Sequence, residues 1–373
     1  MNVLLDDGMT FNRVGGIARY TRLLHRSLQR SGVNVAIARK PLFRGPRIYR
    51  RLSYIFWVNT VMRRTIMNAD YDIVHFTNYL TPFSKTPASK VIVTIHDMVA
   101  WKLPWTLPKS YIYYLRHAIK RALLSADAVI TVSETIRREL RDIMNYQGKV
   151  YVVPNMLAPE FSQELFPKAE PCEMISFREK MGIEPEAKVI TYVGALEYRK
   201  NILTLLKAYS RLSDYIGDRD QVFLSLIGNP GPGFPKIKEF IQGYRPAMPW
   251  KMYSSLSDEL LRNMYDISDM IVLPSYYEGF GLPIIEAWAR GVPVILSDIP
   301  VFREVAGEAG LYFPPQDEYA LASAIGYLIS SMDIREKMVA NGYRKLQNYT
   351  MEQVGRQLIQ VYKDIADDND LKG

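Results

Sequence analysis

The feature that most constrains the fold is a series of short, continuous apolar runs separated by helix-length stretches. The runs are rich in Val and Ile and do not alternate with polar residues, which is typical of parallel strands buried on both faces. The pattern therefore predicts an α/β protein with parallel sheets covered by helices. The runs lie at residues 2–5, Val33–Ala38, Ile73–Phe76, Val91–Ile95, Ala128–Val132, Val150–Asn155, Val189–Gly194, Val222–Ile227, Met270–Leu273, Pro293–Leu296 and Leu311–Phe313.

The length of the chain predicts two domains. At 373 residues it is too long for one compact core. The less periodic stretch Met156–Cys172 is expected to cross between the domains. We predict a first domain over residues 1–165 and a second over 166–350, with the terminal helix 351–368 returning to the first.

The cysteine content and the N-terminus bear on the cellular setting. The only cysteine is Cys172, so an internal disulfide and a cysteine-based metal site are excluded, and a reducing, cytoplasmic setting fits best. Residues Met1–Asp7 lack a basic region followed by a long apolar stretch and are expected to form a first strand rather than a signal peptide. No apolar run approaches the ~20 residues that span a bilayer.

The charge is divided unevenly along the chain. Residues 1–150 hold 24 Lys and Arg against 9 Asp and Glu, a net charge of +15, whereas residues 151–373 hold 23 against 30, a net charge of −7. A basic half indicates an anionic partner, either a membrane surface with phosphate-bearing lipids or a nucleic acid. The alternative is a solvated basic surface with no specific partner.

One stretch, Tyr276–Trp288, combines a strand end, a glycine turn, a helix start and two carboxylates. Met270–Leu273 reads as a buried strand that stops at Pro274, and a helix starts at Leu282-Pro283, where the missing proline N–H costs nothing. A helix that opens from a glycine turn directs free N–H groups toward a ligand, which favours a phosphate.

The two carboxylates of this stretch flank the predicted phosphate site. Glu286 lies about one turn inside the helix and can accept a pair of vicinal hydroxyls, as on a ribose. Glu278 precedes the glycines and lies on the other side of the phosphate. The alternative is an ordinary strand-to-helix connection with two solvated glutamates.

Three further places carry candidate site residues. Gly15-Gly16 lies between a strand and a helix, where backbone can approach a phosphate or sugar or simply turn the chain. His96 follows a parallel strand, at the edge where open sheets place their ligands, although a packed core histidine is the alternative. Arg199 and Lys200 precede a helix start, where the helix dipole disfavours cations unless an anion compensates, and the alternative is a solvated pair.

The segment Leu52–Val58 is apolar and aromatic, with arginines before it and Arg63-Arg64 after it. Such a helix is either a core helix of the first domain with extended basic ends or a helix that lies in a membrane interface. Both interpretations remain open at this point.

These motifs, in this order, resemble the retaining glycosyltransferases of family 4 ("group 1"), which have the GT-B fold. The resemblance covers nearly the whole chain, and its most specific element is the pair of glutamates with seven residues between them. It is carried by Gly15–Tyr20, Thr94–Asp97, Val132–Glu134, Tyr192–Gly194, Arg199–Asn201 and Glu278–Glu286. It implies two Rossmann-like domains with parallel sheets that face each other across a cleft.

The resemblance also implies roles for individual residues. Arg199 and Lys200 would bind the diphosphate of a nucleotide-sugar, and Glu286 would bind the ribose hydroxyls. Gly15 and Gly16 would close on the donor from the first domain, and His96 would lie near the sugar. The donor sugar and phosphate would be held by Glu278 with the backbone of Gly279, Phe280, Gly281 and Leu282.

One position departs from the family. Many relatives carry an arginine directly after the glycine of the second-domain strand, whereas here Ala195 follows Gly194. Arg199 is expected to take over part of that role.

We therefore expect a cytoplasmic enzyme that transfers a hexose, with mannose favoured, and that either is free in the cytoplasm or lies at the inner face of the membrane. The donor is a nucleotide-diphosphate sugar and the acceptor a lipid-linked or polysaccharide glycan, with His96, Glu278 and Lys200 as the catalytic residues. No cofactor or metal ion is expected, because the cations suffice for the diphosphate. The alternatives are a sugar-nucleotide epimerase or glycan phosphorylase of the same fold, and a non-catalytic nucleic-acid-binding protein.

Overall fold

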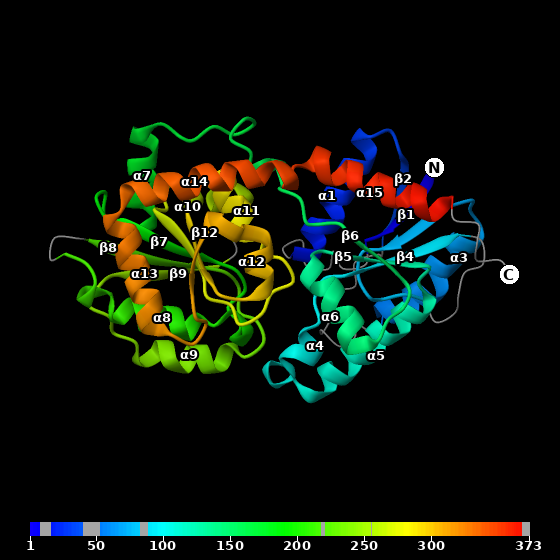
Figure 1. The fold of residues 1–373 in the computed structure, drawn as a ribbon, viewed down its shortest axis with the longest axis horizontal. Coiled ribbons are helices and arrows are strands. Elements are labelled where there is room, and N and C mark those ends of the chain that lie inside the picture. Colours follow the sequence, from blue (N-terminus) through cyan, green and yellow to red (C-terminus); the bar gives the residue numbers. More distant parts are fainter. Residues whose placement is uncertain (8–15, 40–52, 83–88, 218–220, 255, 368–373) are drawn as a thin grey trace. The chain divides into compact units, whose positions relative to one another are not determined.

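The fold is described from a computed structural model that covers residues 1–7, 16–39, 53–82, 89–217, 221–254 and 256–367 (Figure 1). The chain divides into two units. The first comprises Met1–Pro104, Pro108–Met156 and Thr350–Gly373, and the second comprises Trp105–Leu107 and Leu157–Tyr349. The sequence predicts a boundary after residue 165, whereas in the structure residues 157–165 belong to the second unit.

The first unit is built on a parallel sheet of six strands in the order β2-β1-β3-β4-β5-β6. Because the order reverses beside β1, which pairs with both β2 and β3, the sheet is doubly wound. Its strands are β1 (Asn2–Asp6), β2 (Asn34–Ala38), β3 (Ile73–Phe76), β4 (Lys90–Ile95), β5 (Ala128–Thr131) and β6 (Lys149–Val152).

Helices cover this first sheet. The C-terminal helix α15 packs against α1, and Figure 1 shows the two side by side. The helices of this unit include α1 (Gly16–Arg30), α3 (Arg63–Met67), α4 (Val99–Lys102), α5 (Lys109–Ser125), α6 (Glu134–Met144) and α15 (Met351–Ala366).

The segment around Leu52–Val58 is helical from residue 53, and Leu52 itself lies outside the described residues. The helix continues through a π-helical turn at Val58–Met62 into α3. Tyr54, Trp57 and Val58 are buried in the core, whereas Phe56 is 70% exposed. One face of this helix therefore belongs to the core, and the opposite face is accessible.

The second unit holds another parallel sheet of six strands, in the order β12-β11-β10-β7-β8-β9. Its chain order reverses between β7 and β10, which lie next to each other. The strands are β7 (Lys188–Val193), β8 (Val222–Ile227), β9 (Trp250–Tyr253), β10 (Met270–Leu273), β11 (Val294–Ser297) and β12 (Gly310–Phe313).

The helices of the second unit lie on both sides of this sheet (Figure 1). They are α7 (Pro171–Met181), α8 (Ile202–Ser210), α9 (Phe234–Gly243), α10 (Asp258–Asp266), α11 (Leu282–Ala289), α12 (Pro300–Ala306), α13 (Glu318–Ser330) and α14 (Met332–Leu346). One large apolar cluster includes Ile190, Leu205, Val272 and Leu321, and a smaller cluster packs around Val189 and Met264. Two buried faces explain why these strands read as continuous apolar runs.

The predicted α/β class with parallel sheets is confirmed. Among the described residues, no helix is both long enough and apolar enough to cross a bilayer.

Candidate active site

The candidate site of the second unit lies where its sheet reverses strand order. Open α/β sheets bind ligands beyond the carboxyl ends of the strands at such a point. Arg199 and Lys200 follow β7 in a 3₁₀ turn, Tyr198–Lys200, and Glu278 follows β10. Because β7 and β10 are neighbours, the topology brings together residues that are about 80 positions apart in the sequence.

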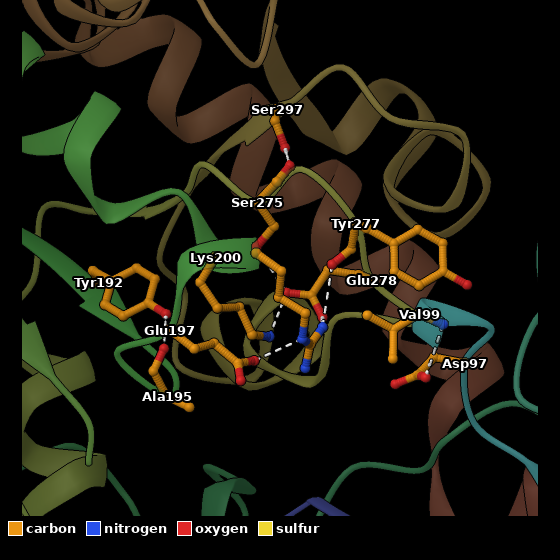
Figure 2. Close-up of polar contacts among 11 residues, drawn as sticks. Asp97, Val99, Tyr192, Ala195, Glu197, Lys200, Ser275, Tyr277, Glu278 and Ser297 are labelled. Atoms are coloured by element: carbon orange, nitrogen blue, oxygen red, sulfur yellow. Dashed lines mark hydrogen bonds and ion pairs between the residues drawn. The ribbon is translucent and has the colours of Figure 1, made fainter. Parts of the chain in front are cut away.

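Glu278 is held by three side chains, and Figure 2 labels two of them, Lys200 and Ser275. Its Oε1 accepts hydrogen bonds from Lys200 Nζ and from Ser275 Oγ, the latter at 2.7 Å. Its Oε2 accepts from Arg199 Nη1 at 3.2 Å. The sequence predicts an anion beside Arg199 and Lys200, and in the structure the carboxylate of Glu278 occupies that position.

Arg199 contacts a second carboxylate and the backbone. Its Nε lies 2.6 Å from Glu197 Oε1, and its Nη1 donates to the carbonyl oxygen of Tyr277 at 3.2 Å. The turn before it is fixed by the Tyr192 hydroxyl, which donates to the carbonyl oxygen of Ala195 at 2.8 Å (Figure 2). The carbonyl group of Ala195 is therefore a backbone anchor for this turn.

Burial and neighbouring charges shift the pKa values of Glu278 and Lys200 in opposing directions. Burial alone would raise the pKa of Glu278, but Lys200, Arg199 and the hydrogen bonds from Lys200 and Ser275 together lower it below its ordinary value. Burial lowers the pKa of Lys200, and the attraction of Glu278 opposes that shift. Glu278 is consequently a weak base that stays ionised at neutral pH.

Sequence reasoning missed three of the residues that support this carboxylate. Ser275 and Ser297 are fully buried, and the Ser297 hydroxyl donates to the carbonyl oxygen of Ser275 (Figure 2). Glu197 lies next to the cation pair in the sequence. A serine three residues before Glu278 and an acid two residues before Arg199 were visible signals, whereas Ser297 comes from a separate strand end.

The loop from Gly279 to Leu282 leads into α11. Gly281 has φ +105°, and a Cβ there would lie 2.9 Å from side-chain carbons of Ile284 and Phe302, so this position requires glycine. The Phe280 side chain is buried, with its ring centroid 5.5 Å from that of Tyr349. Leu282 is the first residue of α11, as the sequence predicted.

Glu286 lies inside α11 and is 2% exposed. The hydroxyl of Tyr265, at the end of α10, donates to its Oε2 at 2.7 Å. Glu286 and Glu278 therefore have different hydrogen-bond partners, and sequence reasoning did not identify Tyr265.

The remaining candidates belong to the first unit. His96 follows β4, and its Nε2 donates to the carbonyl oxygen of Thr77 at 2.8 Å. Burial lowers its pKa, against the opposing effects of Thr77 and Asp97, so the imidazole is neutral at neutral pH. Gly16 begins α1 and is exposed, whereas Gly15 lies outside the described residues.

Within the described ranges, no three His, Cys, Asp or Glu side chains are grouped so that they could hold a metal ion. Among the described residues at this site, Arg199 and Lys200 supply the cationic side chains that contact Glu278.

Comparison with known proteins identifies two family regions and related proteins. Residues 14–161 match the family described as Glycosyltransferase Family 4, and residues 174–345 match the family described as Glycosyl transferases group 1. O-antigen chain mannosyltransferase B of Escherichia coli is 31% identical over 296 residues, 79% of this chain and 74% of that protein. O-antigen chain mannosyltransferase RfbU of Salmonella typhimurium is 26% identical over 275 residues, 73% of this chain and 68% of that protein.

Among solved structures, Anabaena HepE in complex with UDP-glucose has a TM-score of 0.73 at 16% identity, over 98% of this chain and 100% of that chain. This likeness extends to the whole fold, and the predicted GT-B fold is confirmed. Since both halves of the chain match the family and the Escherichia coli relative is similar over most of its length, the chain belongs to the group 1 glycosyltransferases of family 4.

Proposed function

We propose that this glycosyltransferase moves mannose from a nucleotide-diphosphate sugar to a lipid-linked or polysaccharide acceptor, with retention of anomeric configuration. The choice of mannose rests on the names of the two relatives, both mannosyltransferases of O-antigen chains. The use of a nucleotide-sugar rests on the site of the second unit and on the family.

One observation carries the proposal. Arg199 and Lys200 converge on the Glu278 carboxylate where β7 and β10 end, so the protein already holds an anion at the sheet edge that binds ligands. The loop that carries Glu278 leads into α11, and the N-terminus of this helix also favours an anion. A donor diphosphate supplies the negative charge that this arrangement attracts.

The chemistry follows from the same contacts. The bond from the anomeric carbon to the diphosphate breaks, and the two cations stabilise the growing negative charge. Glu278 is a poor base because its pKa is lowered and it accepts three hydrogen bonds. The acceptor hydroxyl therefore passes its proton to the leaving phosphate as its oxygen bonds to the anomeric carbon. The proposed reaction needs no metal ion or cofactor.

The family resemblance also implicates three residues of the first unit, His96, Gly15 and Gly16, in binding the donor. His96 donates from Nε2 to the Thr77 carbonyl, and this hydrogen bond fixes its ring while the lowered pKa keeps the ring uncharged. A fixed neutral imidazole suits a position near the donor sugar, where the family resemblance places His96.

We further propose that the enzyme works in the cytoplasm at the inner face of the membrane. The first 150 residues carry a net charge of +15. Phe56, Val61 and Met67 are at least half exposed on the helical segment that also carries Arg63 and Arg64. Exposed apolar side chains beside arginines suit contact with anionic lipid, which would bring the enzyme to a lipid-linked acceptor.

The test uses the purified enzyme with a panel of nucleotide-diphosphate sugars, each assayed for nucleoside diphosphate release with and without a glycan acceptor. Acceptor-dependent release, fastest with a mannosyl donor, is expected. Release or epimerisation of the donor without acceptor would point to the other reactions of this fold. The anomeric configuration of the product, determined by NMR, checks retention.

Two substitutions test the site itself. Lys200→Ala and Glu286→Ala should each weaken nucleoside diphosphate binding about tenfold or more in calorimetry, because each removes a charged hydrogen-bonding group. Lys188→Ala is the matched control, since Lys188 begins the same strand β7 at its opposite end and pairs with Asp269. Wild-type binding by both site variants would overturn the site assignment.

A further inference from the structure

The end of α10 holds α11 through two consecutive residues with buried side chains. The Tyr265 hydroxyl donates to Glu286 Oε2 at 2.7 Å. Asp266 accepts from Arg290, with Nε to Oδ1 and Nη2 to Oδ2 both at 2.7 Å. Arg290 caps the C-terminus of α11 and lies four residues after Glu286, so both contacts lie on the same side of the helix, about one turn apart.

The Arg290 contact fixes how α11 is rotated about its axis. Both side chains of the pair are buried, at 0% exposure for Arg290 and 2% for Asp266, and the two parallel hydrogen bonds define one geometry. Arg290 Nη1 also donates to the carbonyl oxygen of Phe166 at 2.6 Å. The helix therefore cannot turn about its axis without breaking a buried ion pair, which would be costly.

The Tyr265 contact fixes the Glu286 carboxylate. The Tyr265 ring is fully buried and meets the Phe161 ring edge-on, with 5.6 Å between centroids. Its hydroxyl is therefore held in one place rather than free to follow the carboxylate. The bond from this fixed hydroxyl to Oε2 therefore orients the carboxylate group.

We propose that Tyr265 is a positioning residue for recognition of the donor ribose. It orients Glu286 so that the carboxylate meets the vicinal 2′- and 3′-hydroxyls of the nucleotide. This inference rests on the proposed function, in which Glu286 binds those hydroxyls. Tyr265 itself need not touch the donor.

The test measures ribose recognition directly rather than activity. GDP and UDP are each compared with their 2′,3′-dideoxy counterparts by calorimetry, and the ratio of the two dissociation constants reports the contribution of the hydroxyls. Tyr265→Phe removes only the hydroxyl and keeps the ring contacts. It should weaken binding of the ribonucleotide about tenfold and leave binding of the dideoxynucleotide unchanged, so the ratio falls about tenfold.

Tyr253→Phe is the matched control. Tyr253 is a buried tyrosine of the same unit, and its hydroxyl donates to the carbonyl oxygen of Met181 at 2.9 Å, so its loss should leave the ratio unchanged. Thermal unfolding of both variants checks that each is folded at the assay temperature. A purely structural role for Tyr265 would lower stability without changing the ratio.

Glu286→Ala separates the two hypotheses. If Glu286→Ala leaves the ratio at its wild-type value, the assignment of Glu286 to the ribose fails, and the proposed site fails with it. If Glu286→Ala abolishes the discrimination but Tyr265→Phe retains it, the ribose site stands and the positioning role of Tyr265 is overturned.

Discussion

At the scale of single residues, Glu278 shows how partners determine the state of a buried carboxylate. Glu278 is only 9% exposed, yet its carboxylate stays ionised because Lys200, Arg199 and Ser275 donate hydrogen bonds to it. The ionised carboxylate in turn compensates part of the charge of the two cations. With Glu197, which pairs with Arg199, two carboxylates balance the two cations.

This balance predicts a pH-dependent stability. Glu278→Gln should lower the free energy of unfolding by about 3 kcal/mol at pH 7, because Lys200 and Arg199 lose the charge that compensates them. Since the pKa of Glu278 is lowered below 4.5 in the folded protein, its contribution is present above that value and lost as the pH falls through the lowered pKa. Urea unfolding of the variant and the wild type from pH 7 to pH 3 should show the two curves converging.

The control for this experiment is Glu239→Gln, which changes an exposed glutamate of α9. Its free energy of unfolding should follow that of the wild type across the same pH range. A constant difference between Glu278→Gln and the wild type down to pH 3 would contradict the lowered pKa.

At the scale of elements, the terminal helix α15 is built into the first unit by close contacts. A Cβ at Gly355 would lie 2.2 Å from Ser27 Oγ on α1, so the helices approach each other closely there. The Tyr362 hydroxyl lies 2.6 Å from His75 Nδ1 on β3, and the other ring nitrogen of His75 lies 2.7 Å from Thr94 Oγ1 on β4. Burial, with a smaller effect of His96, lowers the pKa of His75 to about 3, so this ring is neutral.

Tyr362→Phe should therefore weaken the attachment of α15. The buried His75 would lose one of its two hydrogen-bond partners, at a cost of about 1–2 kcal/mol in the free energy of unfolding, measured in urea. Tyr327→Phe is the control. Tyr327 on α13 is 49% exposed, so water can replace the hydrogen bonds of its hydroxyl and the free energy of unfolding should change little. Equal losses in the two variants would refute the proposed anchoring role of the Tyr362 hydroxyl.

At the scale of the whole molecule, the uneven charge predicts binding to anionic membranes. The protein should float with vesicles that contain anionic lipid at low salt and should dissociate near 1 M salt, where the Debye length is about 3 Å. Phe56→Glu should weaken this association, because it places a negative charge on the exposed face of the first unit's helix.

Ile175→Glu provides the matched control for the membrane experiment. It makes the same change of charge at a 48% exposed apolar residue of α7 in the second unit, and flotation should be unaffected. Failure of the wild type to float with anionic vesicles at low salt would remove the membrane from the proposal.

The sequence by itself determined the fold class, most of the strands and the helix start at Leu282. These depend on local signals, namely apolar runs, proline positions and glycine turns, which act over a few neighbouring residues. The same locality explains what was missed. Strand β9 has two exposed residues and is defined by its pairing with β8, and α14 was not predicted either.

Only the tertiary structure decided which side chains meet. The contacts of Glu278 with Lys200, of Glu286 with Tyr265 and of His75 with Tyr362 join residues 78, 21 and 287 positions apart. No local pattern encodes such pairs, because strand order and helix packing bring them together after the elements have formed. The sequence thus indicated a ligand site at Glu278 and Glu286. The fold decided that Glu278 contacts Lys200 and Arg199, and that Glu286 accepts a hydrogen bond from the buried Tyr265.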